Sequence, residues 1–230
     1  MMSFDVVLIL NAVPRMLAGI GMTLLLFSLS AVIGLVLAVV LMLMRISGRW
    51  WLSWPSQVYI YVFRGTPILV QIFIIYYGLP QFDWIREGPF WSVLRDPFGC
   101  AVLALSLNTG AYVSEILRGG VLGVDKGLDE AGAALGLSLP QRFVYITVPI
   151  AVRLALPAYG NDIISLMKAT ALASTITLTE MTGIARTIVA ETFAPYEVFL
   201  SLAAIYVTLT WGLQRGFARL ELRLGRYMIK

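Results

Sequence analysis

The sequence predicts an all-α fold, a polytopic membrane helical bundle of about five transmembrane helices. Of the 230 residues, 59% are apolar and 13% are charged, and the mean hydropathy is +0.85. Soluble domains carry about 25% charged residues, so this chain has roughly half the usual charge. Five apolar runs come close to the roughly 20 residues that a helix needs to cross about 30 Å of hydrocarbon. They lack the apolar–polar alternation of membrane β-strands.

The composition also excludes several classes of protein. So apolar a chain is neither a disordered protein nor an ordinary water-soluble enzyme. It contains no His and a single Cys, Cys100, which argues against His-bound haem and most zinc sites and rules out an internal disulfide. The net charge of +4 favours a membrane surface over nucleic acid. We expect no cofactor, no metal site and no nucleic-acid partner.

One transmembrane domain is expected to occupy residues 1–230, with five spans in order along the chain. The first span has no charged residue between Arg15 and Arg45, and the second contains Arg64 and Pro67. The third and fourth carry polar and ionisable residues, and the fifth follows Pro195. The approximate bounds of the five spans are Leu17–Met44, Val58–Leu79, Phe98–Leu117, Thr147–Met167 and Val198–Leu213.

The distribution of Lys and Arg predicts the orientation. Cytoplasmic loops of membrane proteins carry an excess of these residues. The first loop, the third loop and the C-terminal tail together hold ten of them, whereas the N-terminal segment and the second and fourth loops hold four. We therefore expect the C-terminus in the cytoplasm and the N-terminus outside.

The third loop, residues 119–148, has the pattern of a helix–turn–helix on the membrane surface. Asp125 is suited to cap a first helix whose N-terminal turn is acidic. Gly136 is suited to end that helix in a left-handed conformation, and Ser138 to cap a second short helix. The pattern leaves two interpretations open: a connector resting on lipid headgroups, or an element that docks a partner.

Four segments of the chain resemble the polar amino-acid permeases of bacterial ABC importers. EAGAALG at Glu130–Gly136, with ITVP ten residues later, is similar to the EAA loop of these permeases, apart from Gly132 in place of the third Ala and Val148 in place of Leu. The other three segments keep the same order and spacing over nearly the whole chain: Phe63–Pro80, Leu107–Gly120 and Leu156–Thr175.

The resemblance implies a permease subunit of the bacterial inner membrane that performs no chemistry itself. It implies that the third loop couples the chain to an ATPase through Glu130, Ala131, Gly132 and Gly136. The expected partners are a second permease subunit (a similar chain or another copy of this one), two ATP-binding subunits, an extracytoplasmic solute-binding protein and the bilayer. The chain has no GxxxxGK[ST] phosphate loop, which agrees with an ATPase on a separate chain.

Polar residues inside the spans predict the substrate path. An ionisable residue in a membrane span is costly and is therefore a functional candidate. Asp162 follows Pro157 and Gly160, a point where the helix is expected to be weak and where transporters expose polar groups. We assign the path to Asn108, Asn161, Asp162 and Ser165. The alternative for Asp162 is an ion pair within the chain or with the second permease subunit.

A carboxylate in the third span suggests an ion pair. We expect Glu115 to pair either with Arg64 of the second span or with Arg118, three residues further along its own helix.

The block Lys168–Gly183 resembles permeases of the histidine, arginine, lysine, octopine and nopaline type most closely, which implies a cationic amino acid or an opine as substrate. A neutral polar amino acid is the alternative. A secondary transporter would explain Asp162 and Glu115 but not the coupling-type loop. A membrane enzyme would need a catalytic constellation, and the sequence shows none.

Overall fold

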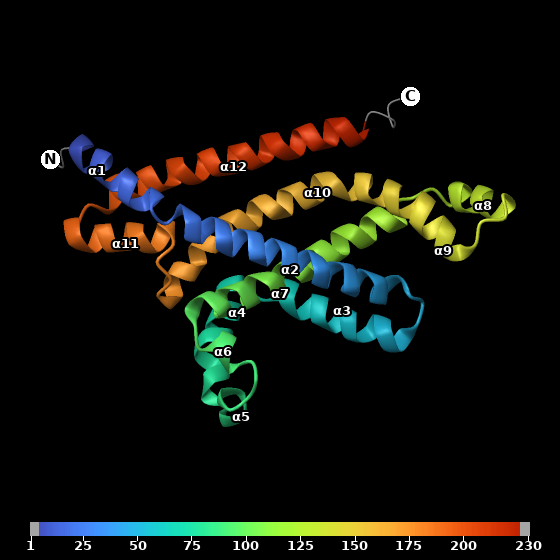
Figure 1. Cartoon of the computed structure of the whole chain (residues 1–230), viewed down its shortest axis with the longest axis horizontal. Coiled ribbons are helices and arrows are strands. Elements are labelled where there is room, and N and C mark those ends of the chain that lie inside the picture. Colours follow the sequence, from blue (N-terminus) through green and yellow to red (C-terminus); the bar gives the residue numbers. More distant parts are fainter. Residues whose placement is uncertain (1–4, 226–230) are drawn as a thin grey trace.

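A computed structural model describes residues 5–225, and this part of the chain is a bundle of helices without strands (Figure 1). Sixteen helical segments follow one another: α1 Val6–Leu17, α2 Ile20–Ile46, α3 Trp50–Gly65, α4 Ile68–Phe73, η1 Ile74–Gly78, η2 Leu79–Gln81, α5 Asp83–Arg86, α6 Trp91–Leu94, α7 Pro97–Leu122, α8 Lys126–Ala134, α9 Leu139–Arg142, η3 Phe143–Thr147, α10 Val148–Ala169, η4 Thr170–Ile176, α11 Met181–Thr192 and α12 Pro195–Gly225. The all-α prediction is confirmed.

Four helical segments are long and apolar enough to cross a membrane, and a bent pair of helices meets the same criterion only when its two parts are taken together. The four segments are Ile20–Ile46, Pro97–Leu122, Leu139–Ile176 and Pro195–Leu224. The bent pair joins Trp50–Gly65 to Ile68–Gln81 at an angle of 105°. Four of the five predicted spans are therefore confirmed, and the second, Val58–Leu79, falls on the bent pair, which counts as a crossing when its two parts are taken as one and is called the second crossing below.

Besides the short helices α5 and α6 of the second loop, two longer helices were not predicted from the sequence. Helix α1 lies in the N-terminal segment and α11 in the fourth loop, and both are too short to span a membrane. They pack against each other and against the start of α12, forming a small core around Met16, Met181, Ile188 and Val198. Each of the two helices has only 12 residues, a length at which tertiary packing supplies most of the stability of a helix.

The main core is built around α7, which α2 contacts along much of its length. The face of α7 toward its neighbours is rich in small residues, so the backbones approach closely. A Cβ at Gly34 would lie 2.9 Å from Thr109, and one at Gly110 would lie 2.7 Å from Leu37. Helix α10 crosses the other side of α7, where Gly120 meets Ala151 and Ala155.

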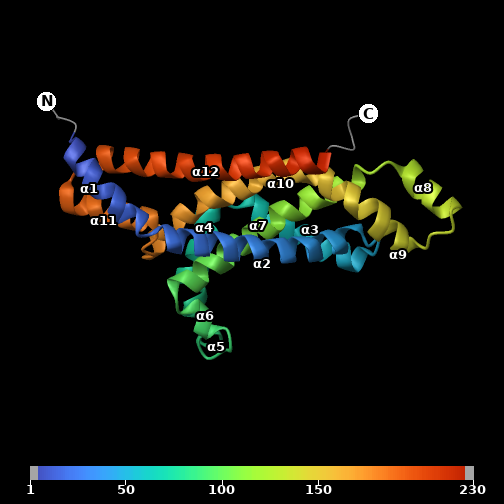
Figure 2. The same ribbon diagram turned by 45° about the horizontal axis from the view of Figure 1, so that its top comes forward.

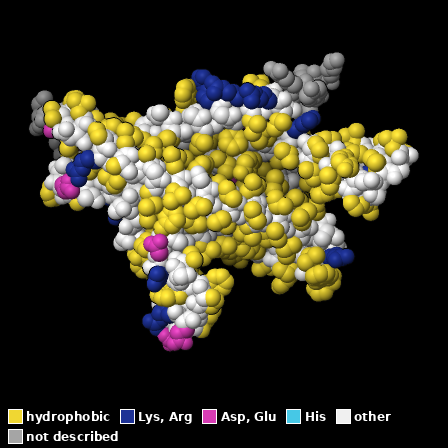
Figure 3. All heavy atoms as spheres, viewed as in Figure 1, with side chains coloured by type: hydrophobic (Ala, Val, Ile, Leu, Met, Phe, Trp, Pro, Cys, Tyr) yellow, Lys and Arg dark blue, Asp and Glu magenta, His cyan; other side chains and the backbone are white. Residues whose placement is uncertain are grey.

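The ends of the helices agree with the predicted arrangement of loops. Figure 1 shows the α2–α3 turn, α8, α9 and the C-terminal end of α12 at one end of the bundle, with α1 and α11 at the other. Hydrophobic side chains cover most of the face in Figure 3, and Lys and Arg gather along the C-terminal half of α12. The first loop, the third loop and the end of α12, which hold most of the predicted cytoplasmic cations, therefore share one end.

Helices α5 and α6 form an arm that projects sideways from the bundle (Figure 2). Ile85 and Leu94 are buried at its inner side, whereas Trp84 and Phe90 are more than 70% exposed. The arm follows directly from the bend in the second crossing, which turns the chain away from the bundle axis.

Candidate functional site

The second crossing breaks between α3 and α4 because of Pro67. A residue before proline is disfavoured in the α-helical region, and Thr66 is accordingly extended, with φ −115° and ψ 143°. Pro67 is extended as well and begins α4 as its N-cap. The span expected over Val58–Leu79 therefore consists of two helices, since the proline ends one helix and starts another.

Two side-chain amides satisfy the backbone at this break. The Nε2 of Gln71 donates to the carbonyl oxygens of Phe63 at 2.9 Å and of Thr66 at 3.1 Å. The Nδ2 of Asn108, on α7, donates to the same Phe63 carbonyl at 3.3 Å and to the Oε1 of Gln71 at 3.1 Å. Carbonyl groups without a hydrogen-bond donor are costly within a membrane, so the hydrogen bonds from these amides offset the cost of the break.

A cavity of about 720 Å³ lies between the break, α7 and α10. Its polar lining contains all four residues assigned to the substrate path, together with Arg64 and Thr66 from the break: Arg64, Thr66, Asn108, Asn161, Asp162 and Ser165. The volume is that of a typical small-molecule site. Sequence reasoning missed the contribution of Thr66 and Gln71, although the Thr66–Pro67 step was a signal for the break.

Asp162 and Arg64 face this cavity from different helices. Among residues 5–225, neither side chain forms an ion pair. Asp162 is partly buried on α10, and the Oγ of Ser165, one turn further on, donates to the Asn161 carbonyl oxygen at 3.0 Å. The alternative of an ion pair for Asp162 within the chain is therefore not found in the described part of the molecule.

Helix α10 is continuous at Pro157, contrary to the weak point expected there. A neighbouring helix supports this stretch. Gly160 lies against Phe217 of α12, to which a Cβ would approach within 3.1 Å, and the ring of Tyr159 meets the same phenylalanine edge-on. Such packing allows a membrane helix to tolerate proline. The helix break lies instead across the cavity, between α3 and α4.

A second cavity, of about 600 Å³, continues from the first toward the basic end of the bundle. The two cavities share Arg64, Gly65, Thr66 and Tyr112. Glu115 and Arg45 lie on the wall of the second cavity.

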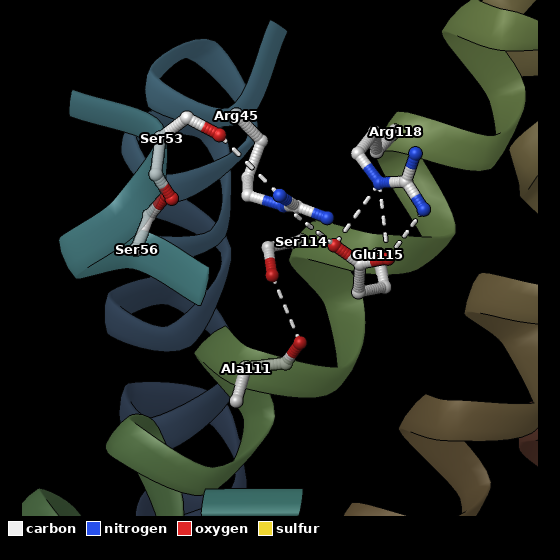
Figure 4. Close-up of polar contacts among 7 residues, drawn as sticks. All are labelled: Arg45, Ser53, Ser56, Ala111, Ser114, Glu115 and Arg118. Carbon is white, nitrogen blue, oxygen red and sulfur yellow. Dashed lines mark hydrogen bonds and ion pairs between the residues drawn. The ribbon is translucent and has the colours of Figure 1, made fainter. Parts of the chain in front are cut away.

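Glu115 is held by two arginines (Figure 4). The Nη2 of Arg118 lies 2.7 Å from Oε2 of Glu115, and the Nε of Arg45 lies 3.3 Å from Oε1. The Glu115–Arg118 alternative is confirmed, and Arg45 is an additional partner. The Arg64–Glu115 pair is wrong, because the Arg64 guanidinium lies over the ring of Tyr112, with its Cζ 5.2 Å from the ring centroid.

The third loop forms the predicted helix–turn–helix. The Asp125 carboxylate accepts from the Gly127 amide at 2.8 Å at the start of α8, and Gly136 has φ +80° directly after the helix. At the start of α9, the Gln141 side chain accepts from the Ser138 amide at 2.8 Å. These interactions confirm the local predictions, with Glu130 just beyond the first turn of α8.

The two helices of the loop are fixed to each other. Arg142 contacts Asp129 with Nη1 2.6 Å from Oδ2. Gly132 is buried, and a Cβ there would lie 2.6 Å from Cδ1 of Ile146. Glycine in place of the expected alanine thus lets α8 pack closely on the segment that enters α10. Around this unit Leu135, Leu139 and Tyr145 are more than 70% exposed.

Sequence reasoning missed Glu180, a fully buried carboxyl group at the start of α11. It accepts hydrogen bonds from the Gly183 amide at 2.9 Å, from the Tyr206 hydroxyl at 3.2 Å and from the Thr23 hydroxyl at 3.3 Å. Burial raises the pKa of this carboxyl, and the hydrogen bonds oppose that shift. Glu180 thus connects α11 with α2 and α12, which nothing local in the sequence signals.

Known proteins share this architecture. A family model described as the binding-protein-dependent transport system inner membrane component matches residues 30–226. The chain belongs to this family. It is 48% identical over 220 residues to the octopine transport system permease protein OccM of Rhizobium meliloti, a match that covers 96% of this chain and 90% of the relative.

Two further matches agree. The chain is 39% identical over 206 residues to the histidine/lysine/arginine/ornithine transport system permease protein HisM of Escherichia coli K12, covering 89% of this chain and 87% of HisM. A crystal structure of an amino acid ABC transporter with histidines matches with a TM-score of 0.86 and 33% identity, covering 96% of this chain and 100% of that one. The chain is a multi-pass inner-membrane permease subunit of the ABC class.

Proposed function

We propose that this permease forms the translocation path of an ATP-driven importer for cationic amino acids or opines. The observation that carries the proposal is the cavity lined by Asn108, Asn161, Ser165 and the unpaired carboxylate of Asp162. A partly desolvated carboxylate is stabilised by a cation, because charge interactions strengthen as water is excluded. The relatives named for octopine and for histidine, lysine, arginine and ornithine support the same substrate class.

The third loop is proposed as the coupling element, within residues 119–148 of a single transmembrane domain. Its two short helices are rigidly joined and present exposed Leu135, Leu139 and Tyr145. Glu130, Ala131, Gly132 and Gly136 form or support that surface. An exposed apolar patch of this kind marks a contact with a partner protein or with the membrane. We assign the contact to an ATP-binding subunit.

The complete importer is proposed to contain a second permease subunit, two ATP-binding subunits and an extracytoplasmic solute-binding protein.

Arginine, with its guanidinium, is a suitable probe of the substrate class, and glutamine is its neutral polar counterpart.

The test replaces Asp162 by Asn, which keeps the shape and removes the charge. Uptake of L-arginine and of L-glutamine is measured in cells and divided by the amount of assembled importer. A hydrogen bond to a charged group contributes about 1.5–3 kcal/mol, so arginine uptake should fall about tenfold or more. Asp83→Asn, which removes a carboxylate from the exposed arm, is the matched control and should change neither uptake.

Three results would each mean something definite. Unchanged arginine uptake per assembled importer in the Asn variant would remove Asp162 from the path. A loss of assembled importer with normal uptake per complex would identify Asp162 as a partner in an ion pair between subunits. Efficient uptake of glutamine but not arginine by the unaltered importer would replace the cationic substrate by a neutral one.

A further inference from the structure

Arg64 occupies a particular place in this molecule. It lies in the last turn of α3, directly before the break, with an exposed side chain. It lines both cavities, so it stands where one opens into the other. Arg64 therefore faces a ligand in either cavity.

The charge of Arg64 is not neutralised within residues 5–225. Arg45 and Arg118, on neighbouring helices, share the Glu115 carboxylate, whereas Arg64 contacts the face of Tyr112. The Tyr112 hydroxyl donates to the Arg64 carbonyl oxygen at 3.4 Å, which holds the ring against the end of α3. A cation–π contact at an exposed position is weak, so the guanidinium is available to a stronger partner.

The chemistry of that partner follows from the guanidinium itself. Arginine stays charged in proteins and presents a planar set of donors that matches a carboxylate with two parallel hydrogen bonds. The same cavity holds Asp162, a carboxylate without an ion-pair partner in the described chain. A ligand that carries both a carboxylate and a cation would neutralise both groups at once.

We propose that Arg64 binds the carboxylate of the substrate while Asp162 binds its cationic group. This inference rests on the proposed function and adds the second half of the recognition. When no substrate is bound, the guanidinium of Arg64 keeps its cation–π contact with the Tyr112 ring. Arg64 is then a specificity residue: it selects amino acids and opines over amines that have the same cationic group but no carboxylate.

The experiment compares two probes that differ only in the carboxylate, L-arginine and its decarboxylated form, agmatine. Binding of each to the detergent-purified membrane complex of permease and ATP-binding subunits, without the solute-binding protein, is measured by isothermal titration calorimetry. Arg64→Gln removes the charge and Arg64→Lys keeps it without the planar donors. Arg86→Gln, on the exposed arm, is the control.

The unaltered importer should bind arginine at least about tenfold more tightly than agmatine. Arg64→Gln should lower arginine affinity about tenfold and leave agmatine affinity unchanged, so that the preference disappears. Arg64→Lys should retain part of the preference, and Arg86→Gln all of it. Asp162→Asn should weaken both probes by a similar factor, because both carry the guanidinium.

The inference is overturned if Arg64→Gln leaves the arginine preference intact, or if the unaltered importer binds both probes equally. Failure of the proposed function gives a different pattern. In that case Asp162→Asn leaves both affinities unchanged, whatever the Arg64 variants do. Absence of binding of either probe to the unaltered importer would overturn the inference and the cationic substrate class together.

Discussion

Replacement of Glu180 by Ala should destabilise the contact between the two cores of the molecule. The carboxyl group is fully buried and accepts from the Gly183 amide, the Tyr206 hydroxyl and the Thr23 hydroxyl. Each lost partner leaves a buried donor that must find another acceptor or remain unpaired, which costs about 1–3 kcal/mol per orphaned group.

The structure shows which donors have a second acceptor. The Thr23 hydroxyl lies 3.2 Å from the Gly19 carbonyl oxygen, and the Tyr206 hydroxyl lies 3.1 Å from Oγ1 of Thr182. The Gly183 amide at the helix start loses its cap, which costs about 1 kcal/mol. The one methylene that is deleted, Cγ, adds about 0.8 kcal/mol. We therefore expect a loss of about 2–4 kcal/mol in the free energy of unfolding.

The assay is the thermal stability of the detergent-purified importer, followed by size-exclusion chromatography after heating. Glu180→Gln should keep most of the stability, because burial disfavours the charged form of this carboxyl and the amide retains an acceptor oxygen. Glu191→Gln, which alters an exposed contact with Arg15, is the control. If Glu180→Ala is as stable as Glu191→Gln, the connection between α2, α11 and α12 does not depend on Glu180.

Three further predictions concern the coupling loop, the Glu115 cluster and the topology. Gly136→Val places a β-branched side chain at φ +80°, which costs about 1–2 kcal/mol or more, so less ATP-binding subunit should co-purify or ATP hydrolysis should proceed without uptake. The control is Gly119→Ala, whose added methyl group meets open space. Normal uptake with normal co-purification of the Gly136→Val variant would contradict the proposed coupling role. Glu115→Ala leaves Arg45 and Arg118 without their carboxylate and should lower the stability by about 1–3 kcal/mol, measured by the same heating assay. Arg45→Ala should lower the stability less, since Arg118 remains paired with Glu115. Equal losses in the two variants would contradict this ranking. A reporter fused after Lys230 should read as cytoplasmic and one inserted at Gly88 in the arm as external, and the reverse result would refute the orientation derived from Lys and Arg.

The third loop shows how far local sequence information reaches. Asp125, Gly136 and Ser138 were assigned their places from capping and glycine chemistry alone, and the structure has them there. Such features depend on residues within about one helical turn, so they can be predicted from neighbouring residues in the sequence. The spans follow equally from local hydropathy, because the thickness of the bilayer fixes the length of apolar helix required.

The candidate site was predictable as a set of residues but not as an arrangement. Asn108, Asn161, Asp162 and Ser165 were selected because polar groups in membrane spans are costly, and they do line one cavity. The sequence did not show that Asn108 also supports a broken helix, since that depends on Gln71 and the Phe63 carbonyl oxygen across the bend. The weak point expected at Pro157 failed for a similar reason: α10 is continuous there because Phe217 of α12 packs against it at Gly160.

The sequence by itself determined the family, the all-α class, four of the membrane spans, the shared side of the basic loops and the two short helices of the third loop, all of which follow from composition, short spacing or motif. Only the tertiary structure decided the partners of Glu115, the position of Arg64 beside Tyr112 and the clamp at Glu180. It also decided that α1 and α11 are helices, because their stability comes from the core they share with α12. These contacts join residues far apart in the chain, and several pairings satisfy the same charges and donors, so geometry alone selects among them.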